Sequence, residues 1–202
     1  FMQQGTPFIY QGQEIGMTNV KFDSIYDYND VKGINIYKEK VEQGLSGEEA
    51  LKYVWAVSRD NSRTPMQWDS SENSGFTTGK PWIKINKNHK YINVKDQLKD
   101  ENSILNFYKK MINIRKENKT LIYGSYDLIL EDHEKIYAYT RIMREEEFVI
   151  IVNLSHDNVK YSYDINLHSD GLLLSNYNVE KHALLTEFDL RPYEARIYKV
   201  IK

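Results

Sequence analysis

The sequence contains no cysteine. This excludes disulfide bonds, thiolate metal sites and cysteine nucleophiles, and it fits a reducing compartment. The sequence also lacks an excess of basic residues, because 27 Lys and Arg stand against 29 Asp and Glu. No broad cationic face is therefore available for nucleic acid or an anionic membrane. No apolar run reaches the roughly 18 residues that a membrane helix needs, and no signal-peptide pattern is present. We expect a cytoplasmic protein with no nucleic-acid or membrane partner.

The composition that remains is that of a globular chain. Hydrophobic residues make up 41% and charged residues 28% of the 202 positions, enough to build a packed core. Aromatic residues make up 13%; such rings stack on sugar faces, but they also pack β-sheets. The length suits one large or two small domains. Because the first residue is Phe1 rather than Met, we expect a piece of a longer protein.

The first half of the chain reads as helices and loops with one strand. Residues 6–10 form a short apolar run between glycines, which predicts a buried strand of a parallel sheet. Apolar spacing over 30–41 predicts a helix, and a capping box begins a second helix over 46–57, so that the two form a hairpin. Residues 59–82 are rich in Pro, Gly and small polar residues, which predicts a long ordered loop of the kind that often carries function.

In the second half the hydrophobic period changes from helix to strand. A helical stripe covers 104–116, and the alternation over 136–142 and the apolar run 148–152 then predict strands. Further strands, spaced as in an antiparallel sandwich, are expected at 126–130, 159–165, 172–175 and 195–200. The domain boundary is expected between residues 118 and 124.

Candidates for chemistry are few. The five histidines are scattered without metal-ligand spacing, so we predict no metal and no other cofactor. Glycoside hydrolysis needs two carboxylates that flank the scissile bond. Several acidic residues could be nominated for it, namely Glu14, Asp23, Asp27, Asp30 and Asp60. The sequence singles out none of them, because a solvated surface or a helix cap is the commoner place for a carboxylate.

The most informative stretch is residues 58–69, which combine two guanidinium groups, amides and an indole in one turn-rich loop. The planar fork of Arg59 or Arg63 could hold a sugar hydroxyl and a carboxylate together, as a pocket for the end of a sugar chain requires. Alternatively, both arginines could pin the loop. The residues alone leave these two interpretations open.

Five segments, in the same order along the chain, resemble the oligo-1,6-glucosidase branch of the α-amylase superfamily, glycoside hydrolase family 13. They are residues 5–17 (GTPFIYQGQEIGM), 59–68 (RDNSRTPMQW), 75–82 (GFTTGKPW), 92–94 (INV) and 190–195 (LRPYEA). The resemblance covers essentially the whole chain, and its loop motifs are specific.

The resemblance implies an α+β fragment. Residues 1–118 would be the last β/α portion of a (β/α)8 TIM barrel, with substrate-recognition loops, and residues 119–202 a C-terminal antiparallel β-sandwich. The eighth barrel strand would begin near Thr6, and 104–116 would be the closing helix. The family's retaining mechanism uses carboxylates on earlier barrel strands, so none of the catalytic residues is expected in this chain. By itself it would be inactive, because it needs the upstream barrel residues of its full-length chain.

For the site, the resemblance implies substrate-binding roles. Arg59 would bond the terminal glucose at the non-reducing end of an α-linked gluco-oligosaccharide, and Arg63 would anchor the loop. Lys32 stands where the family usually has an acidic residue on the leaving-group side, which leaves room for an anionic aglycone.

The main hypothesis is thus that the chain is part of a retaining exo-α-glucosidase. This enzyme would act on α-1,6-linked or other α-linked short oligosaccharides. The alternative is trehalose-6-phosphate hydrolase. From other classes, a non-catalytic heavy chain of an amino-acid transporter is disfavoured by the retention of Arg59 and Arg63, and a sugar-binding module would leave the loop motif unexplained.

Overall fold

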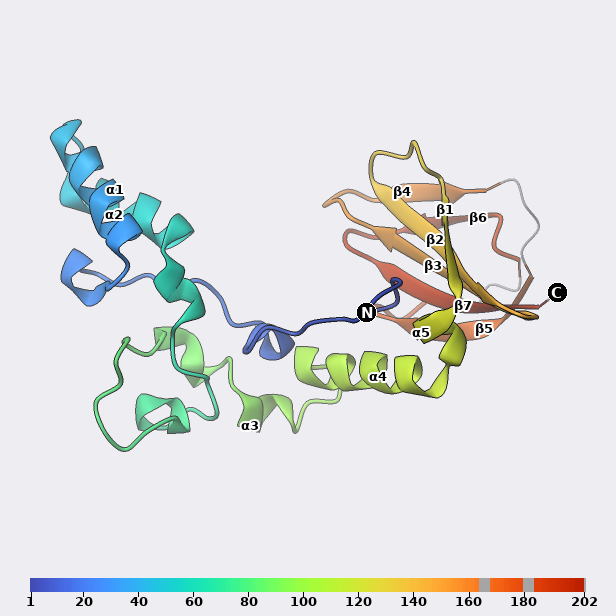
Figure 1. Ribbon diagram of the computed structural model, residues 1–202, viewed down its shortest axis with the longest axis horizontal. Helices are drawn as coiled ribbons and strands as arrows, with labels where there is room; N and C mark the ends of the chain where they lie inside the picture. Colours follow the sequence, from blue (N-terminus) through green and yellow to red (C-terminus); the bar gives the residue numbers. More distant parts are fainter. Residues whose placement is uncertain (164–167, 180–183, 202) are drawn as a thin grey trace. The chain divides into compact units, whose positions relative to one another are not determined.

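The computed structural model describes residues 1–163, 168–179 and 184–201. It divides into two compact units: residues 1–8 with 109–202 form unit 1, and residues 9–108 form unit 2. Figure 1 shows the helices and strands of both units, coloured along the chain. No helix within the described residues is both long enough and apolar enough to cross a membrane.

Unit 2 is built from helices and ordered loops. Its helices are α1 (Val31–Glu42), α2 (Gly47–Val57), the short α3 (Val94–Gln97) and the first part of α4 (Ile104–Glu117), with 3₁₀ turns at Gln13–Ile15, Ile25–Asp27, Arg59–Ser62, Glu72–Gly75 and Lys87–Lys90. The predicted helix hairpin is confirmed, since α1 and α2 pack against each other. The predicted capping box between Ser46 and Glu49 starts α2. Leu51 and Val54 of α2 lie in a buried cluster with residues of the preceding and following loops.

Unit 1 contains the β-structure. Its elements are the last part of α4, helix α5 (Lys119–Tyr123) and strands β1 (Ser125–Ile129), β2 (Ile136–Met143), β3 (Glu146–Asn153), β4 (Val159–Ser162), β5 (His168–Ser175), β6 (Glu187–Leu190) and β7 (Ala195–Ile201). One antiparallel sheet has the order β1-β2-β3-β7-β5, and β4 pairs with β6 in a second sheet. The strands predicted at 126–130, 136–142, 148–152, 172–175 and 195–200 are confirmed to within a few residues.

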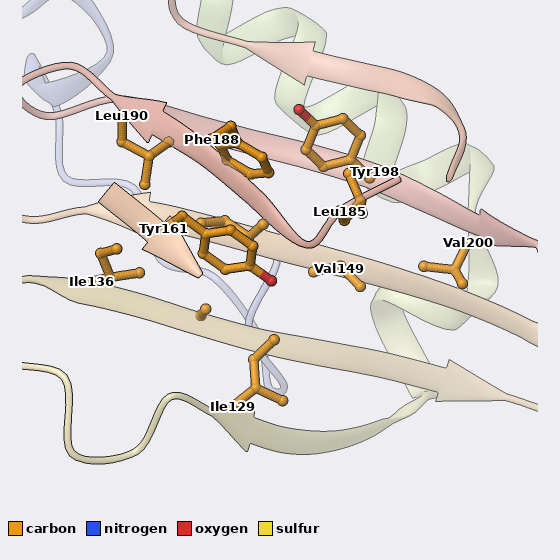
Figure 2. Close-up of a cluster of buried hydrophobic side chains, with 11 residues drawn as sticks. Ile129, Ile136, Val149, Tyr161, Leu185, Phe188, Leu190, Tyr198 and Val200 are labelled. Atoms are coloured by element: carbon orange, nitrogen blue, oxygen red, sulfur yellow. The ribbon is translucent and has the colours of Figure 1, made fainter. Parts of the chain in front are cut away.

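Both faces of the five-stranded sheet are buried, which explains why β3 is apolar at successive positions. Val149 and Ile151 point into a cluster that also contains Tyr161 of β4 and Phe188 of β6, so that this core joins the two sheets (Figure 2). The rings of Tyr161 and Phe188 are stacked with centroids 4.6 Å apart. The alternate residues of β3 contribute to a second cluster on the other face, described next.

The second cluster fixes the first residues of the chain. Met2 and Leu121 pack with Phe148 and Ile150 of β3. Met111 and Ile114 of α4 also pack there, so the apolar stripe predicted for this helix is buried in part. Residues 1–5 are thereby attached to unit 1 rather than to the elements that follow them in sequence.

One expected strand fails and one observed strand was not expected. Residues 6–10 form no strand and are exposed, with Phe8 91% exposed, because no strand of the described chain pairs with this segment and an unpaired strand leaves its backbone groups to solvent. Strand β6 was not predicted. For the strand expected at 159–165, β4 ends at Ser162, and positions 164 and 165 lie outside the described residues.

Gly124, which ends helix α5, is expected to tolerate no side chain. A Cβ there would lie 2.5 Å from the carbonyl oxygen of Thr120 and 2.8 Å from that of Ile142. Both are backbone atoms, so Gly124→Ala should displace the α5–β1 junction and cost about 1–3 kcal/mol. Circular dichroism should show the melting temperature lowered by about 4–8 °C for each kcal/mol. Gly79→Ala is the control, because its Cβ would meet only Thr77 Oγ1 at 3.7 Å; an equal effect of both substitutions would contradict the steric argument.

Candidate functional site

An open pocket of about 480 Å³ lies in unit 2, where helix α1 begins beside the turn at residues 59–63. All three residues predicted to bind substrate, Lys32, Arg59 and Arg63, line it. The remaining lining residues are Asn29, Asp30, Val31, Asn35, Ile36 and Glu39. Residues about 30 positions apart in sequence therefore meet at one concave surface.

Helix α1 supplies one wall of the pocket. Lys32, Asn35, Ile36 and Glu39 have the spacing i, i+3, i+4 and i+7, which places them on one helix face. This spacing is visible in the sequence and could have identified the three neighbours of Lys32.

The approach of α1 to α2 depends on Gly33. A Cβ at Gly33 would lie 3.2 Å from Val54 Cγ1 and 3.6 Å from Asp30 Oδ2. Asp30 itself caps α1, since its Oδ2 accepts a hydrogen bond from the Gly33 N–H at 3.3 Å. The small residue thus lets α1 lie close to Val54 of α2.

The opposite wall is the 3₁₀ turn Arg59–Ser62, which local hydrogen bonds hold in place. The Ser58 hydroxyl accepts from the Asp60 N–H at 3.2 Å and caps the turn. The Asn61 amide donates to the Trp55 carbonyl at 3.0 Å and accepts from the Val20 N–H at 3.0 Å. Local hydrogen bonds therefore hold the turn from which Arg59 projects.

The cations of the pocket differ in exposure and in partners. The Arg59 side chain is 65% exposed, and its Nε lies 3.8 Å from Asp30 Oδ1. The Arg63 side chain is 36% exposed, and its guanidinium lies 3.3 Å from Oδ1 of the fully buried Asp60. The Lys32 side chain is exposed, and its amino group has no hydrogen-bond or ion-pair partner within the described part of the chain. Arg59 and Lys32 thus present donors to a ligand in the pocket, whereas Arg63 is bound at the base of the turn.

Asp30, which lines the pocket, and Asp60, which pairs with the lining residue Arg63, are both engaged by the protein. Asp30 is 4% exposed and Asp60 is fully buried. Burial opposes the ionisation of Asp30, but hydrogen bonds from the backbone N–H groups of Arg59, Gly33 and Lys32, together with the Arg59 charge, hold its pKa below the ordinary value.

The other nominated carboxylates also have protein partners. Glu14 accepts from the Gly12 N–H at 2.8 Å. Asp23 pairs with Lys87 at 2.6 Å and Asp27 with Lys84 at 2.5 Å. Across the described residues, His, Asp and Glu side chains form no group of three that could hold a metal ion.

Comparisons with known proteins find relatives along the whole chain. A model of the α-amylase catalytic domain matches residues 1–124. The oligo-1,6-glucosidase of Parageobacillus thermoglucosidasius is 50% identical in an alignment 202 positions long, which covers 98% of this chain and 36% of that protein. The trehalose-6-phosphate hydrolase of Bacillus subtilis is 40% identical in an alignment 205 positions long, which covers 100% of this chain and 36% of that protein. The crystal structure of trehalose-6-phosphate hydrolase from Bacillus licheniformis superposes with a TM-score of 0.90 and 41% identity, over 100% of this chain and 37% of that one.

The chain therefore belongs to the α-amylase family, the family predicted from the five segments. Relatives named oligo-1,6-glucosidase are glycoside hydrolases of this family. The chain spans about a third of the length of the relatives that it matches.

Proposed function

We propose that this chain is the C-terminal part of a retaining exo-α-glucosidase that hydrolyses α-glucosidic bonds of short oligosaccharides, α-1,6 bonds foremost. The observation that carries the proposal is the convergence of Arg59, Arg63 and Lys32 on one pocket of unit 2. The identity to several oligo-1,6-glucosidases supports the hydrolase class over a transporter heavy chain or a sugar-binding module. The lack of cysteine fits a cytoplasmic enzyme.

In this proposal residues 1–118 are the last part of a (β/α)8 barrel and recognise the substrate. Residues 119–202 are a β-sandwich domain that supports the barrel. The family match ends at residue 124, close to this boundary. The catalytic carboxylates would come from the upstream barrel, because Asp30 and Asp60 are too buried and too strongly engaged to act as nucleophile or acid. By itself the chain would supply binding groups and no chemistry.

Arg59 is the residue that would recognise the terminal sugar of the substrate. A guanidinium that is mostly exposed, but tied to a buried carboxylate, offers its remaining N–H donors in a fixed plane. Hydrogen bonds to hydroxyls of a terminal glucose would hold that sugar with its glycosidic bond toward the rest of the barrel. Cleavage would then release single glucose units from the non-reducing end.

A second candidate, trehalose-6-phosphate hydrolase, is favoured by one observation. Lys32 lines the same pocket and its amino group has no hydrogen-bond or ion-pair partner among the residues that the structure describes, and an unpaired ammonium group suits a phosphate on the leaving sugar. The relatives of that name are 40% and 41% identical to this chain, little below the oligo-1,6-glucosidases.

The two candidates can be separated with the full-length parent enzyme. Glucose release is measured on isomaltose and on trehalose 6-phosphate, for wild type and for Lys32→Glu. The α-1,6 proposal predicts the higher kcat/KM on isomaltose, with Lys32→Glu changing the ratio by about twofold to fivefold, as expected for an exposed charge. A strong preference for trehalose 6-phosphate that Lys32→Glu abolishes would establish the second candidate. The 202-residue chain alone should release no glucose from either substrate.

A further inference from the structure

Two buried carboxylates at the pocket have no part in the proposed chemistry. Asp30 and Asp60 are 30 residues apart in sequence, and the fold brings them together. A buried carboxylate costs free energy unless hydrogen bonds and opposite charges compensate for lost hydration. Their partners therefore show what they do.

Asp30 connects helix α1 to Arg59 through three contacts. Its Oδ2 accepts from the Gly33 N–H at 3.3 Å and from the Arg59 N–H at 3.0 Å. Its Oδ1 lies 3.8 Å from Arg59 Nε. One carboxylate thus fixes both the main chain and the guanidinium of the residue proposed to bind glucose.

Asp60 in turn fixes Asp30. Asp60 Oδ2 accepts from the backbone N–H groups of Asn29 at 2.6 Å and Asp30 at 3.0 Å, while its Oδ1 accepts from Arg63. Each loop therefore contributes a carboxylate that binds the backbone of the other loop. Arg59 is thereby held at its backbone N–H, and its Nε is paired with Asp30 beside the pocket that both residues line.

We infer that Asp30 is a positioning residue, which orients Arg59 for the terminal sugar and is itself held in place by Asp60. This inference rests on the proposed function of Arg59. Asp30 touches no substrate in this account and acts only through the arginine. A capping role alone would require the Gly33 contact but neither contact with Arg59.

The test is a double-mutant cycle in the full-length parent enzyme, with Asp30→Asn, Arg59→Ala and the double variant. Asparagine is as good a helix N-cap as aspartate, so Asp30→Asn should keep the melting temperature while removing the charge beside the guanidinium. We expect kcat/KM on a nitrophenyl α-glucoside to fall about two- to fivefold, given that Arg59 is largely exposed. In the Arg59→Ala background the same substitution should have no further effect.

Ser46→Ala provides the matched control, because it removes the N-cap of α2 without touching the pocket. It should lower the melting temperature and leave kcat/KM per folded molecule unchanged. If Asp30→Asn were silent, or if its effect simply added to that of Arg59→Ala, the positioning role would be wrong. If Arg59→Ala itself left kcat/KM unchanged, the proposed function of Arg59 would fail instead. If Asp30→Asn folds poorly, the same double-mutant cycle is run with Asp30→Glu. This variant keeps the negative charge and still measures the coupling between residues 30 and 59.

Discussion

Replacing Arg141 with methionine is expected to lower the free energy of unfolding of unit 1 by about 3–5 kcal/mol. The Arg141 side chain is fully buried on strand β2. Its guanidinium donates to the carbonyl oxygens of Met2 at 2.7 Å, Leu121 at 2.9 Å, Gly124 at 2.8 Å and Ser125 at 3.1 Å. One side chain therefore holds the start of the chain, helix α5 and the start of β1 together.

The expected loss is large because methionine fills a similar volume but donates no hydrogen bond. Each buried carbonyl left without a donor costs about 1–3 kcal/mol. Arg115, which donates to Phe1, Gln3, Gly5 and Leu121, would keep some of these segments in place. Burial, and then the neighbouring Arg115 charge, lower the pKa of Arg141, so relief of this repulsion offsets part of the loss. A net cost of about 3–5 kcal/mol remains, against a typical total stability of 5–15 kcal/mol.

Urea denaturation and amide hydrogen exchange of β2 and β3 measure this loss. Arg144→Ala, in the exposed turn after β2, is the control and should be nearly neutral. Arg141→Lys should recover only part of the stability, because an ammonium group cannot reach four carbonyls that a planar fork spans. A stability of Arg141→Met within 1 kcal/mol of wild type would show that the carbonyls find other donors.

The elements that could be predicted from the sequence are those that local chemistry determines. Helix α2 begins at its capping box, and β2 and β3 follow their apolar pattern, since each buries residues within one continuous segment. The segment 6–10 carries an equally apolar pattern, yet it forms no strand. A strand depends on a partner that the pattern itself does not contain.

The pocket likewise depends on contacts that a local sequence pattern does not contain. The loop composition alone pointed to Arg59 and Arg63, the family resemblance added Lys32 and a role for each, and the structure brings the three residues together. Asp30 and Asp60 were only two of five nominated carboxylates, because their burial results from contacts between loops about 30 residues apart. Asp30 could have been recognised as a helix cap from the following α1 pattern, whereas nothing local distinguishes Asp60 from a surface aspartate. The division at residue 118 remains a prediction.

Arg59→Ala in the full-length parent enzyme is expected to lower kcat/KM about tenfold to more than a hundredfold. A charge-assisted hydrogen bond is worth about 1.5–3 kcal/mol, at about 1.4 kcal/mol per tenfold change in rate. The loss of Arg59 would also leave the buried Asp30 without its cationic neighbour. Arg59→Lys should restore little, because an ammonium group cannot reproduce the planar fork.

Arg63→Ala is the reciprocal experiment. Arg63 is less exposed and is paired with the fully buried Asp60, so its removal leaves a buried carboxylate that only two backbone N–H groups still satisfy. We expect a lower melting temperature, with kcat/KM per folded molecule nearly intact. Measuring both quantities for both variants separates a sugar-binding arginine from a loop-anchoring one. The assignment is wrong if Arg63→Ala shows the catalytic loss and Arg59→Ala shows only the loss of stability, since the guanidinium that reads the sugar would then be the one bound to Asp60.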